Sequence, residues 1–160
     1  MSETRWLDPL ETRAWRGLMC AHARLVAQLD AELLASSGIS LPDYEVLVHL
    51  SEADSQRLRM SELALRLEIS PSGLTRRLDG LVASGMVERV QCPEDRRGTF
   101  AVLTELGAER LEAAAPAHVA QVRRWFVDRL TRDQLCALAD AMASIIAGSG
   151  ACSSSEVRAS

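Results

Sequence analysis

The amino-acid sequence predicts a mainly helical protein that carries one small β-hairpin. Apolar residues recur every three or four positions in several stretches, which is the spacing of one buried face on an α-helix. Residues 86–91 and 99–103 are instead short runs rich in valine, phenylalanine and threonine, separated by a turn-rich stretch. The 160 residues, 48% hydrophobic and 25% charged, fit one folded domain, or one domain with an oligomerising extension.

The first two helices are bounded by capping residues. The stretch Asp-Pro-Leu-Glu at residues 8–11 combines an N-cap aspartate, a proline at the first helical position and a glutamate that closes a capping box. An apolar stripe with one polar interruption follows, at Leu10, Ala14, Leu18, His22, Leu25, Leu29 and Leu33. Gly38 ends this helix. Ser40 caps a second helix that reaches Leu50, and its inward side chains are expected to be Tyr44, Leu47 and Val48.

A pair of short helices comes next. Residues 52–60 predict a polar loop that ends in a short strand, and residues 61–67 predict a short helix with Leu63, Ala64 and Leu67 buried. The helix at residues 71–84 has Ser70 as its N-cap and Gly85 as a left-handed C-cap. Its apolar face consists of Leu74, Leu78, Leu81 and Val82. Two helices joined by so short a turn are typical of a helix-turn-helix.

The β-hairpin follows this helix pair directly. Its strands, residues 86–91 and 99–103, are joined by the charged tip at residues 92–98. A helix-turn-helix followed by such a hairpin is a winged helix-turn-helix, which we assign to residues 40–104. The fold class is therefore mainly α with a small β-hairpin wing.

Two further helices are predicted after the hairpin. One runs from about residue 105 to residue 130 behind the N-cap Thr104, and Pro116 is expected to kink or interrupt it. The other begins at a capping box in residues 131–134 and reaches about residue 147. Residues 148–160 are rich in glycine and serine, and we expect a flexible tail.

The helix at residues 71–84 is the first candidate for a DNA contact. Opposite its leucines it carries Ser72, Thr75, Arg76 and Asp79, with Arg77 at the flank. Short hydroxyls and arginine at the start of an exposed helix suit a major groove about 12 Å wide. We expect the aspartate to pair with Arg76 or to accept from a cytosine. The alternative is an ordinary solvated face.

The hairpin tip is the second candidate. Arg96 and Arg97 are placed to enter a minor groove, whose negative potential favours arginine, and Asp95 is placed to brace one of them. A charged solvent loop is the alternative. The net charge of −4 argues against a nucleic-acid partner, but residues 66–97 hold six arginines against five acids, and a local field decides affinity.

Three motifs together resemble the multiple-antibiotic-resistance-regulator (MarR) family. They are SPSGLTRRLD at residues 70–79, GMVER at residues 85–89, and DRRG at residues 95–98 followed by VLT at residues 102–104. The resemblance extends from about Leu10 to Ala147. It implies a homodimer whose helices at residues 8–38 and 105–147 interlock. It also implies a pseudopalindromic operator and release of DNA when a small, often phenolic or anionic, ligand binds.

The resemblance also implies roles for single residues. Ser72, Thr75, Arg76 and Arg77 correspond to groove-reading positions, and Arg97 corresponds to the minor-groove residue supported by Asp95. Arg89 falls where family members place a basic residue near an effector pocket or in a structural ion pair.

The first long helix offers candidate effector contacts. Trp15, Met19 and His22 follow one another at spacings of four and three, and Tyr44 begins the next helix. An aromatic ring, a thioether and an imidazole on one face suit an aromatic ligand, and the ligand cavity in the family lies between the dimerisation helices and the winged domain. The alternative assigns these side chains to a dimer core. His49 and His118 have no cysteine or carboxylate at metal-ligand spacing, so no metal site or cofactor is predicted.

Other function classes have less support. The four cysteines lack CxxC spacing, and redox sensing through Cys20 or Cys92 is an alternative to inert thiols. A winged-helix module that binds protein rather than DNA is another alternative. No phosphate loop, GxSxG motif or metal cluster indicates an enzyme. No apolar stretch is long enough to span a membrane and no signal peptide is present, so we expect a cytoplasmic protein. The resemblance to the MarR family implies that it is a ligand-responsive, sequence-specific repressor.

Overall fold

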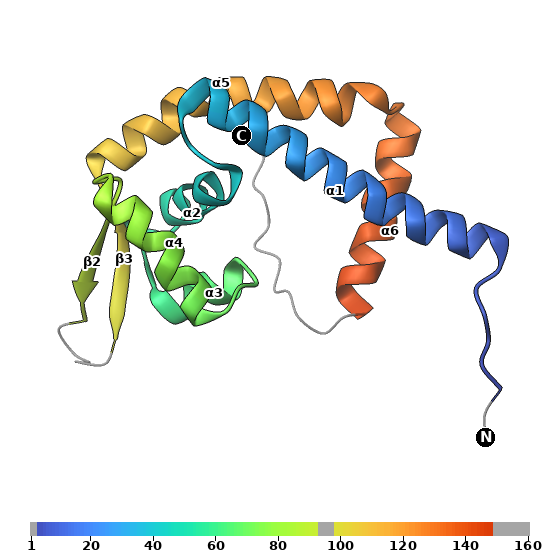
Figure 1. Cartoon of the computed structure of the whole chain (residues 1–160), viewed down its shortest axis with the longest axis horizontal. Helices are drawn as coiled ribbons and strands as arrows, with labels where there is room; N and C mark the ends of the chain where they lie inside the picture. Colours follow the sequence, from blue (N-terminus) through green and yellow to red (C-terminus); the bar gives the residue numbers. More distant parts are fainter. Residues whose placement is uncertain (1–2, 93–97, 149–160) are drawn as a thin grey trace. The chain divides into compact units, whose positions relative to one another are not determined.

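The computed structural model describes residues 3–92 and 98–148 (Figure 1). Its elements follow the predicted order: α1 (Pro9–Ser37), α2 (Leu41–Ser51), a 3-10 turn η1 (Asp54–Gln56), β1 (Arg57–Arg59), α3 (Met60–Arg66), α4 (Pro71–Ala83), β2 (Val87–Gln91), β3 (Thr99–Leu103), α5 (Glu105–Trp125), a 3-10 turn η2 (Val127–Arg129) and α6 (Arg132–Gly148). The chain divides into two units, and the boundary lies within α5 after Gln121. The predicted fold class, mainly helical with a small wing, is confirmed.

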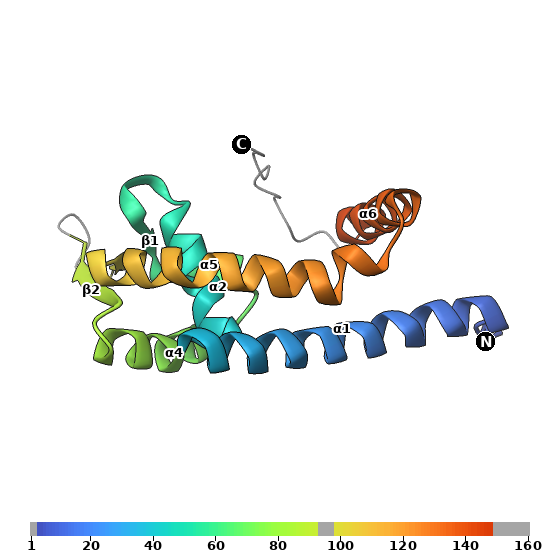
Figure 2. The same ribbon diagram turned by 90° about the horizontal axis from the view of Figure 1, so that it is seen from above.

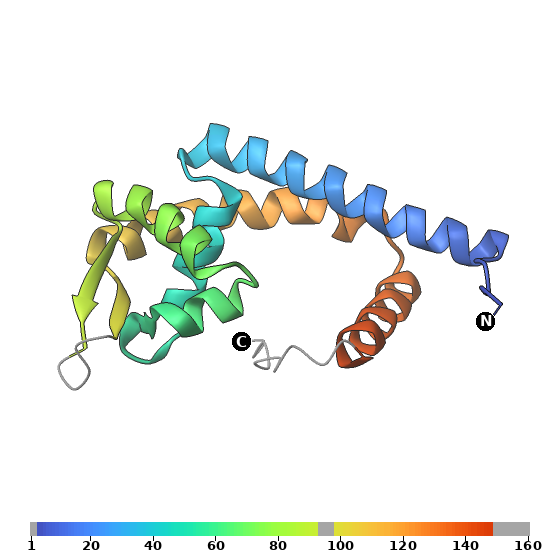
Figure 3. The ribbon, with the colours of Figure 1, turned by 60° about the horizontal axis from the view of Figure 1, so that its bottom comes forward.

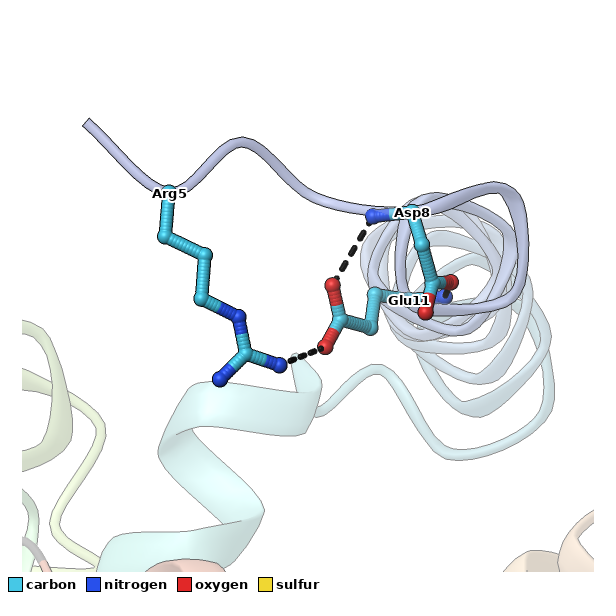
Figure 4. A network of polar contacts seen from close by, with 3 residues as sticks. All are labelled: Arg5, Asp8 and Glu11. Carbon is cyan, nitrogen blue, oxygen red and sulfur yellow. Dashed lines mark hydrogen bonds and ion pairs between the residues drawn. The ribbon is translucent and has the colours of Figure 1, made fainter. Parts of the chain in front are cut away.

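The start of α1 confirms the predicted capping box (Figure 4). The Asp8 carboxylate accepts from the Glu11 backbone amide at 2.8 Å, and the Glu11 carboxylate accepts from the Asp8 amide at 2.8 Å. Arg5 adds an ion pair to the same glutamate at 3.2 Å. Two otherwise unpaired amides of the first turn are thereby satisfied.

Only the C-terminal part of α1 is buried within its own unit. Leu29 and Leu33 are buried, and α1 ends as predicted at Gly38, which has a left-handed φ of 73°. The N-terminal half of the helix extends away from the winged elements (Figure 2). Large apolar side chains remain exposed along the helix, at Leu10, Trp15, Leu18, Met19, Val26 and Leu34. The predicted apolar stripe therefore has no partner within this unit along most of its length.

The sheet of the winged region has three antiparallel strands in the order β1–β3–β2. Alternation along the strands places one set of side chains against the helices, and these are buried: Leu58, Val87, Ala101 and Leu103. The opposite face carries Arg57, Arg59, Glu88, Val90, Phe100 and Val102. The hairpin and the short strand that the sequence predicts thus form one sheet.

The helices α3 and α4 pack against this sheet, and α4 lies beside the β2–β3 hairpin (Figure 3). Leu74, Leu78 and Leu81 are buried as predicted. Val82 is 37% exposed, so its predicted inward placement is wrong. It follows Leu81 by one residue and therefore points about 100° away around the helix. Gly85 has a left-handed φ of 74°, as expected after a helix end.

The C-terminal helices differ from the prediction in two respects, both in α5. Thr104 caps α5 by accepting from the Gly107 amide at 3.0 Å. The helix continues through Pro116 without interruption and ends at Trp125 rather than near residue 130. The capping box at residues 131–134 is present. The predicted tail lies largely outside the described residues. No described helix is both long and apolar enough to cross a membrane.

Candidate nucleic-acid interface

The polar face of α4 is exposed, as the sequence predicts. Ser70 fixes the start of the helix by accepting from the Gly73 amide at 3.1 Å. Ser72, Thr75 and Arg76 are exposed, while Arg77 is half-buried. The Thr75 hydroxyl donates to the Pro71 carbonyl at 2.9 Å, which leaves its oxygen lone pairs available as acceptors. This face of α4 therefore exposes hydrogen-bond acceptors and a guanidinium group, while the leucines of the opposite face are buried.

Asp79 pairs with Arg89, not with Arg76. One guanidinium nitrogen of Arg89 lies 2.8 Å from an Asp79 carboxylate oxygen, and another donates to the Thr75 carbonyl at 2.8 Å. The two acceptors are four residues apart on α4, so one side chain from β2 holds one turn of the helix. The Arg89 side chain is 31% exposed. The resemblance implies that Arg89 lies near an effector pocket or in a structural ion pair, and the contact with Asp79 matches the ion pair.

A shallow cleft of about 240 Å³ lies between the start of α4 and the sheet. Its lining includes Arg59 from β1, Pro71 and Thr75 from α4, and Gly98 and Thr99 at the start of β3. The start of α4 and the base of the hairpin therefore lie on the same side of the winged region. The tip residues Asp95, Arg96 and Arg97 lie outside the described residues, and their role stays a prediction.

The candidate effector residues differ in their exposure to solvent. Trp15 is 56% exposed and Met19 is 49% exposed, and His22 is exposed as well. Tyr44 is buried and packs against His118, with ring centroids 4.6 Å apart. The three α1 side chains are therefore exposed to solvent, whereas Tyr44 lies in the protein core.

His118 is half-buried, and the sequence assigns it no role beyond the absence of a metal-ligand neighbour. Its Nδ1 atom is buried and makes no hydrogen bond within the described part of the chain, as is also true of the Gln121 Oε1 atom one turn later. Burial lowers the pKa of His118, and the nearby Glu45 carboxylate partly opposes this shift. Burial also raises the pKa of Tyr44. A lone histidine without a ligand-spaced neighbour gives no signal in sequence, because its partner comes from α2.

In the part of the chain that the structure describes, the cysteines and the potential metal ligands do not form a binding site. Cys20 is exposed on α1, and Cys92 is buried at the end of β2, where its sulfur accepts from Arg59 at 3.6 Å. The chain's one tyrosine, Tyr44, packs on His118 rather than on a thiol. Among residues 3–92 and 98–148, no three histidine, cysteine or carboxylate side chains are arranged to hold a metal ion.

The structure also reveals basic residues that the sequence analysis did not single out. Arg57 and Arg59 are exposed and lie beside the Phe100 ring. The available signal was the pattern Arg-Leu-Arg in a short strand, which puts two arginines on one face.

A family model described as "MarR family" matches residues 37–98. The chain is 35% identical over 88 residues to the HTH-type transcriptional repressor YetL of Bacillus subtilis, covering 55% of this chain and 53% of YetL. It is 31% identical over 117 residues to the uncharacterized HTH-type transcriptional regulator Mb0904 of Mycobacterium bovis, covering 69% of this chain and 78% of Mb0904. The chain spans about half the length of the first curated relatives that it matches.

Solved structures from Streptomyces coelicolor are similar over nearly the whole chain. AbsC, a MarR family transcriptional regulator, is 41% identical with a TM-score of 0.85, covering 91% of this chain and 97% of AbsC. Sco3205, a MarR family transcriptional regulator in complex with DNA, is 39% identical with a TM-score of 0.87 and covers 92% of each chain.

Proposed function

Because the chain belongs to the MarR family of transcriptional regulators, we propose that it is a sequence-specific, ligand-responsive repressor that binds DNA as a homodimer. The observation that carries this proposal is the exposed face of α4 with Ser72, Thr75 and Arg76, held by Arg89 from the wing. Further support is that a relative of 39% identity, Sco3205, was solved in complex with DNA. An enzyme is not indicated, since the family consists of regulators.

The proposed mechanism places two recognition helices α4 in successive major grooves of a pseudopalindromic operator, about one helical turn apart. Thr75 and Arg76 contact base edges, with Ser72 and Arg77 beside them. Arg96 and Arg97 enter the adjacent minor groove, braced by Asp95. Contacts with phosphates supply salt-dependent affinity.

The proposed homodimer is supported by apolar surface that is exposed in a single chain. On α1, Leu10 and Leu18 are 62% and 37% exposed and share the predicted stripe. On α6, none of the described residues is buried, and Ile145 and Ile146 are 56% and 47% exposed. Apolar surface on such long helices favours association with a second copy.

The proposed effector is a small phenolic or anionic molecule. Trp15, Met19 and His22 supply an exposed aromatic and polar face on α1, and Tyr44 lies near the start of α2. In this proposal, effector binding changes the spacing of the two α4 helices. Since the duplex fixes that spacing, a shift of a few Å disfavours the DNA-bound state.

Arg89 is expected to act on DNA binding without touching DNA. Arg89→Ala leaves the Asp79 carboxylate unpaired on the helix face that approaches phosphates, so we expect about a tenfold loss of operator affinity, or about 1.4 kcal/mol. The double variant Arg89→Ala/Asp79→Asn removes that carboxylate charge and is expected to recover part of the loss. Fluorescence anisotropy of both variants on operator DNA measures this. A double variant that binds no better than Arg89→Ala contradicts this role.

The DNA upstream of this gene tests the proposed function. We expect the wild type to bind it tightly in fluorescence anisotropy at physiological salt with excess nonspecific duplex, and Arg97→Ala to lose this binding. Weak, salt-sensitive binding that is equal for both proteins would contradict reading of that DNA by the wing. The choice would then lie between an operator elsewhere and a protein-binding winged-helix module, whose interface would tolerate Arg97→Ala.

A further inference from the structure

The outer face of the sheet carries two arginines held around one aromatic ring. The guanidinium carbons of Arg57 and Arg59 lie 5.2 and 5.3 Å from the centroid of Phe100. Arg59 also donates to the Cys92 sulfur at 3.6 Å. Stacking on a ring holds a guanidinium in place while its N–H groups remain able to donate at the edge. We call these three residues, Arg57, Phe100 and Arg59, the Arg–Phe–Arg cluster.

The cluster lies at the end of the sheet that faces the proposed DNA-reading elements. Arg59 is opposite Phe100 in the strand register, and Arg57 is opposite Val102. The Arg57 guanidinium nevertheless lies over Phe100, so it leans along the sheet toward the end that residues 92–98 connect. Arg59 also lines the cleft that Thr75 of α4 borders. Both charges are therefore gathered beside the start of the recognition helix and the base of the wing.

The charges on this face favour a polyanion. Its one carboxylate, Glu88, is opposite Val102 and thus two register pairs farther from the hairpin tip than Phe100. No ion pair joins Arg57 to another residue of the described part of the chain. The guanidinium carbons of Arg57 and Arg59 both lie within 5.3 Å of the Phe100 centroid, so two positive charges are concentrated where one stretch of DNA backbone can approach them. The planar fork of arginine also suits phosphate oxygens.

We propose that the Arg–Phe–Arg cluster is a second DNA contact site, which binds backbone phosphates beside the wing and extends the footprint of α4 without reading sequence. This inference rests on the proposed DNA-binding function. The continuity of the cluster with the cleft at α4 favours DNA over an acidic protein partner. In this proposal, Arg57 and Arg59 contact DNA phosphates and so position the protein on the duplex, and they do not read bases.

The salt dependence of DNA affinity tests the cluster. Arg57→Gln and Arg59→Gln are each expected to reduce the slope of log affinity against log salt by about 0.9 per phosphate contact, and by about 1.8 in a dimer. Affinity is expected to fall by the same factor on operator and on shuffled DNA, because phosphates carry no sequence. Arg57→Lys keeps the charge and is expected to keep the slope. Arg132→Gln, at an exposed arginine of the other unit, is the charge-matched control.

The outcomes separate the cluster from the wider proposal. A wild type that binds neither DNA contradicts the proposed function itself. If the wild type binds DNA and the Arg57→Gln and Arg59→Gln variants have the same slope of log affinity against log salt, only the proposed phosphate contact is overturned. An acidic protein is then the partner that fits this face. Equal slope changes in Arg57→Gln and Arg132→Gln also overturn it, because they indicate only a change in net charge. Circular dichroism of each variant establishes that it is folded.

Discussion

Replacing Arg76 with alanine is expected to lower operator affinity by about 2–6 kcal/mol, since a good base contact is worth about 1–3 kcal/mol and a dimer contains two copies. Arg76 is exposed on α4 and forms no ion pair with another described residue, because Asp79 is taken by Arg89. Its guanidinium is therefore available for the major groove. Fluorescence anisotropy on operator and shuffled duplexes measures the loss of affinity, which is expected to be larger for the operator than for the shuffled duplex.

The control for Arg76→Ala is Arg66→Ala. Arg66 lies on α3, carries the same charge and pairs with Glu62 at 2.8 Å, and its side chain is 37% exposed. Arg66→Ala is expected to lower the affinity for operator and for shuffled DNA by the same factor. This factor is expected to be smaller than the loss of operator affinity in Arg76→Ala. If Arg76→Ala bound the operator as tightly as the wild type, α4 would not be reading bases through this residue.

Gly107→Ala is expected to destabilise the fold by about 1–3 kcal/mol or more. A Cβ atom at residue 107 would lie 2.1 Å from the Met86 carbonyl oxygen and 2.8 Å from a Leu103 methyl carbon. The first of these atoms is backbone at the entrance to β2, so relief requires α5 and the hairpin to move apart. Chemical denaturation at one fixed protomer concentration measures the change in free energy of unfolding.

Gly80→Ala is the matched control for Gly107→Ala. A Cβ atom at residue 80 meets nothing within 4 Å, and the residue lies inside α4. Alanine there is expected to raise the free energy of unfolding by about 0.5–1 kcal/mol, because glycine is the more flexible residue in the unfolded chain. A Gly107→Ala protein as stable as the wild type would mean that α5 does not approach the hairpin this closely.

The helix boundaries were predictable from sequence because short-range chemistry determines them. Asp8, Ser40, Ser70 and Thr131 each cap a helix through hydrogen bonds to amides or side chains within three residues. Such contacts require no knowledge of the rest of the fold. Pro116 was misjudged as a possible interruption, since α5 continues through it.

The ion pairs and ring contacts of the site were less predictable because they join distant segments. Asp79 has Arg76 three residues away, yet its partner Arg89 comes from the following strand. Tyr44 meets His118 across 74 residues of sequence, and Arg57 and Arg59 meet Phe100 only once β1 pairs with β3. The motif at residues 70–79 predicted the exposed polar face of α4, but the residues that support this face depend on strand pairing and helix packing.

The ratio of wild-type affinities for operator and for shuffled DNA of the same length tests the central claim most directly. The account predicts tight operator binding at physiological salt, about 10³-fold or more above the shuffled duplex. It also predicts that this ratio persists as salt rises, while both affinities fall. A ratio near one, with both interactions abolished by salt, would contradict sequence-specific regulation by this protein.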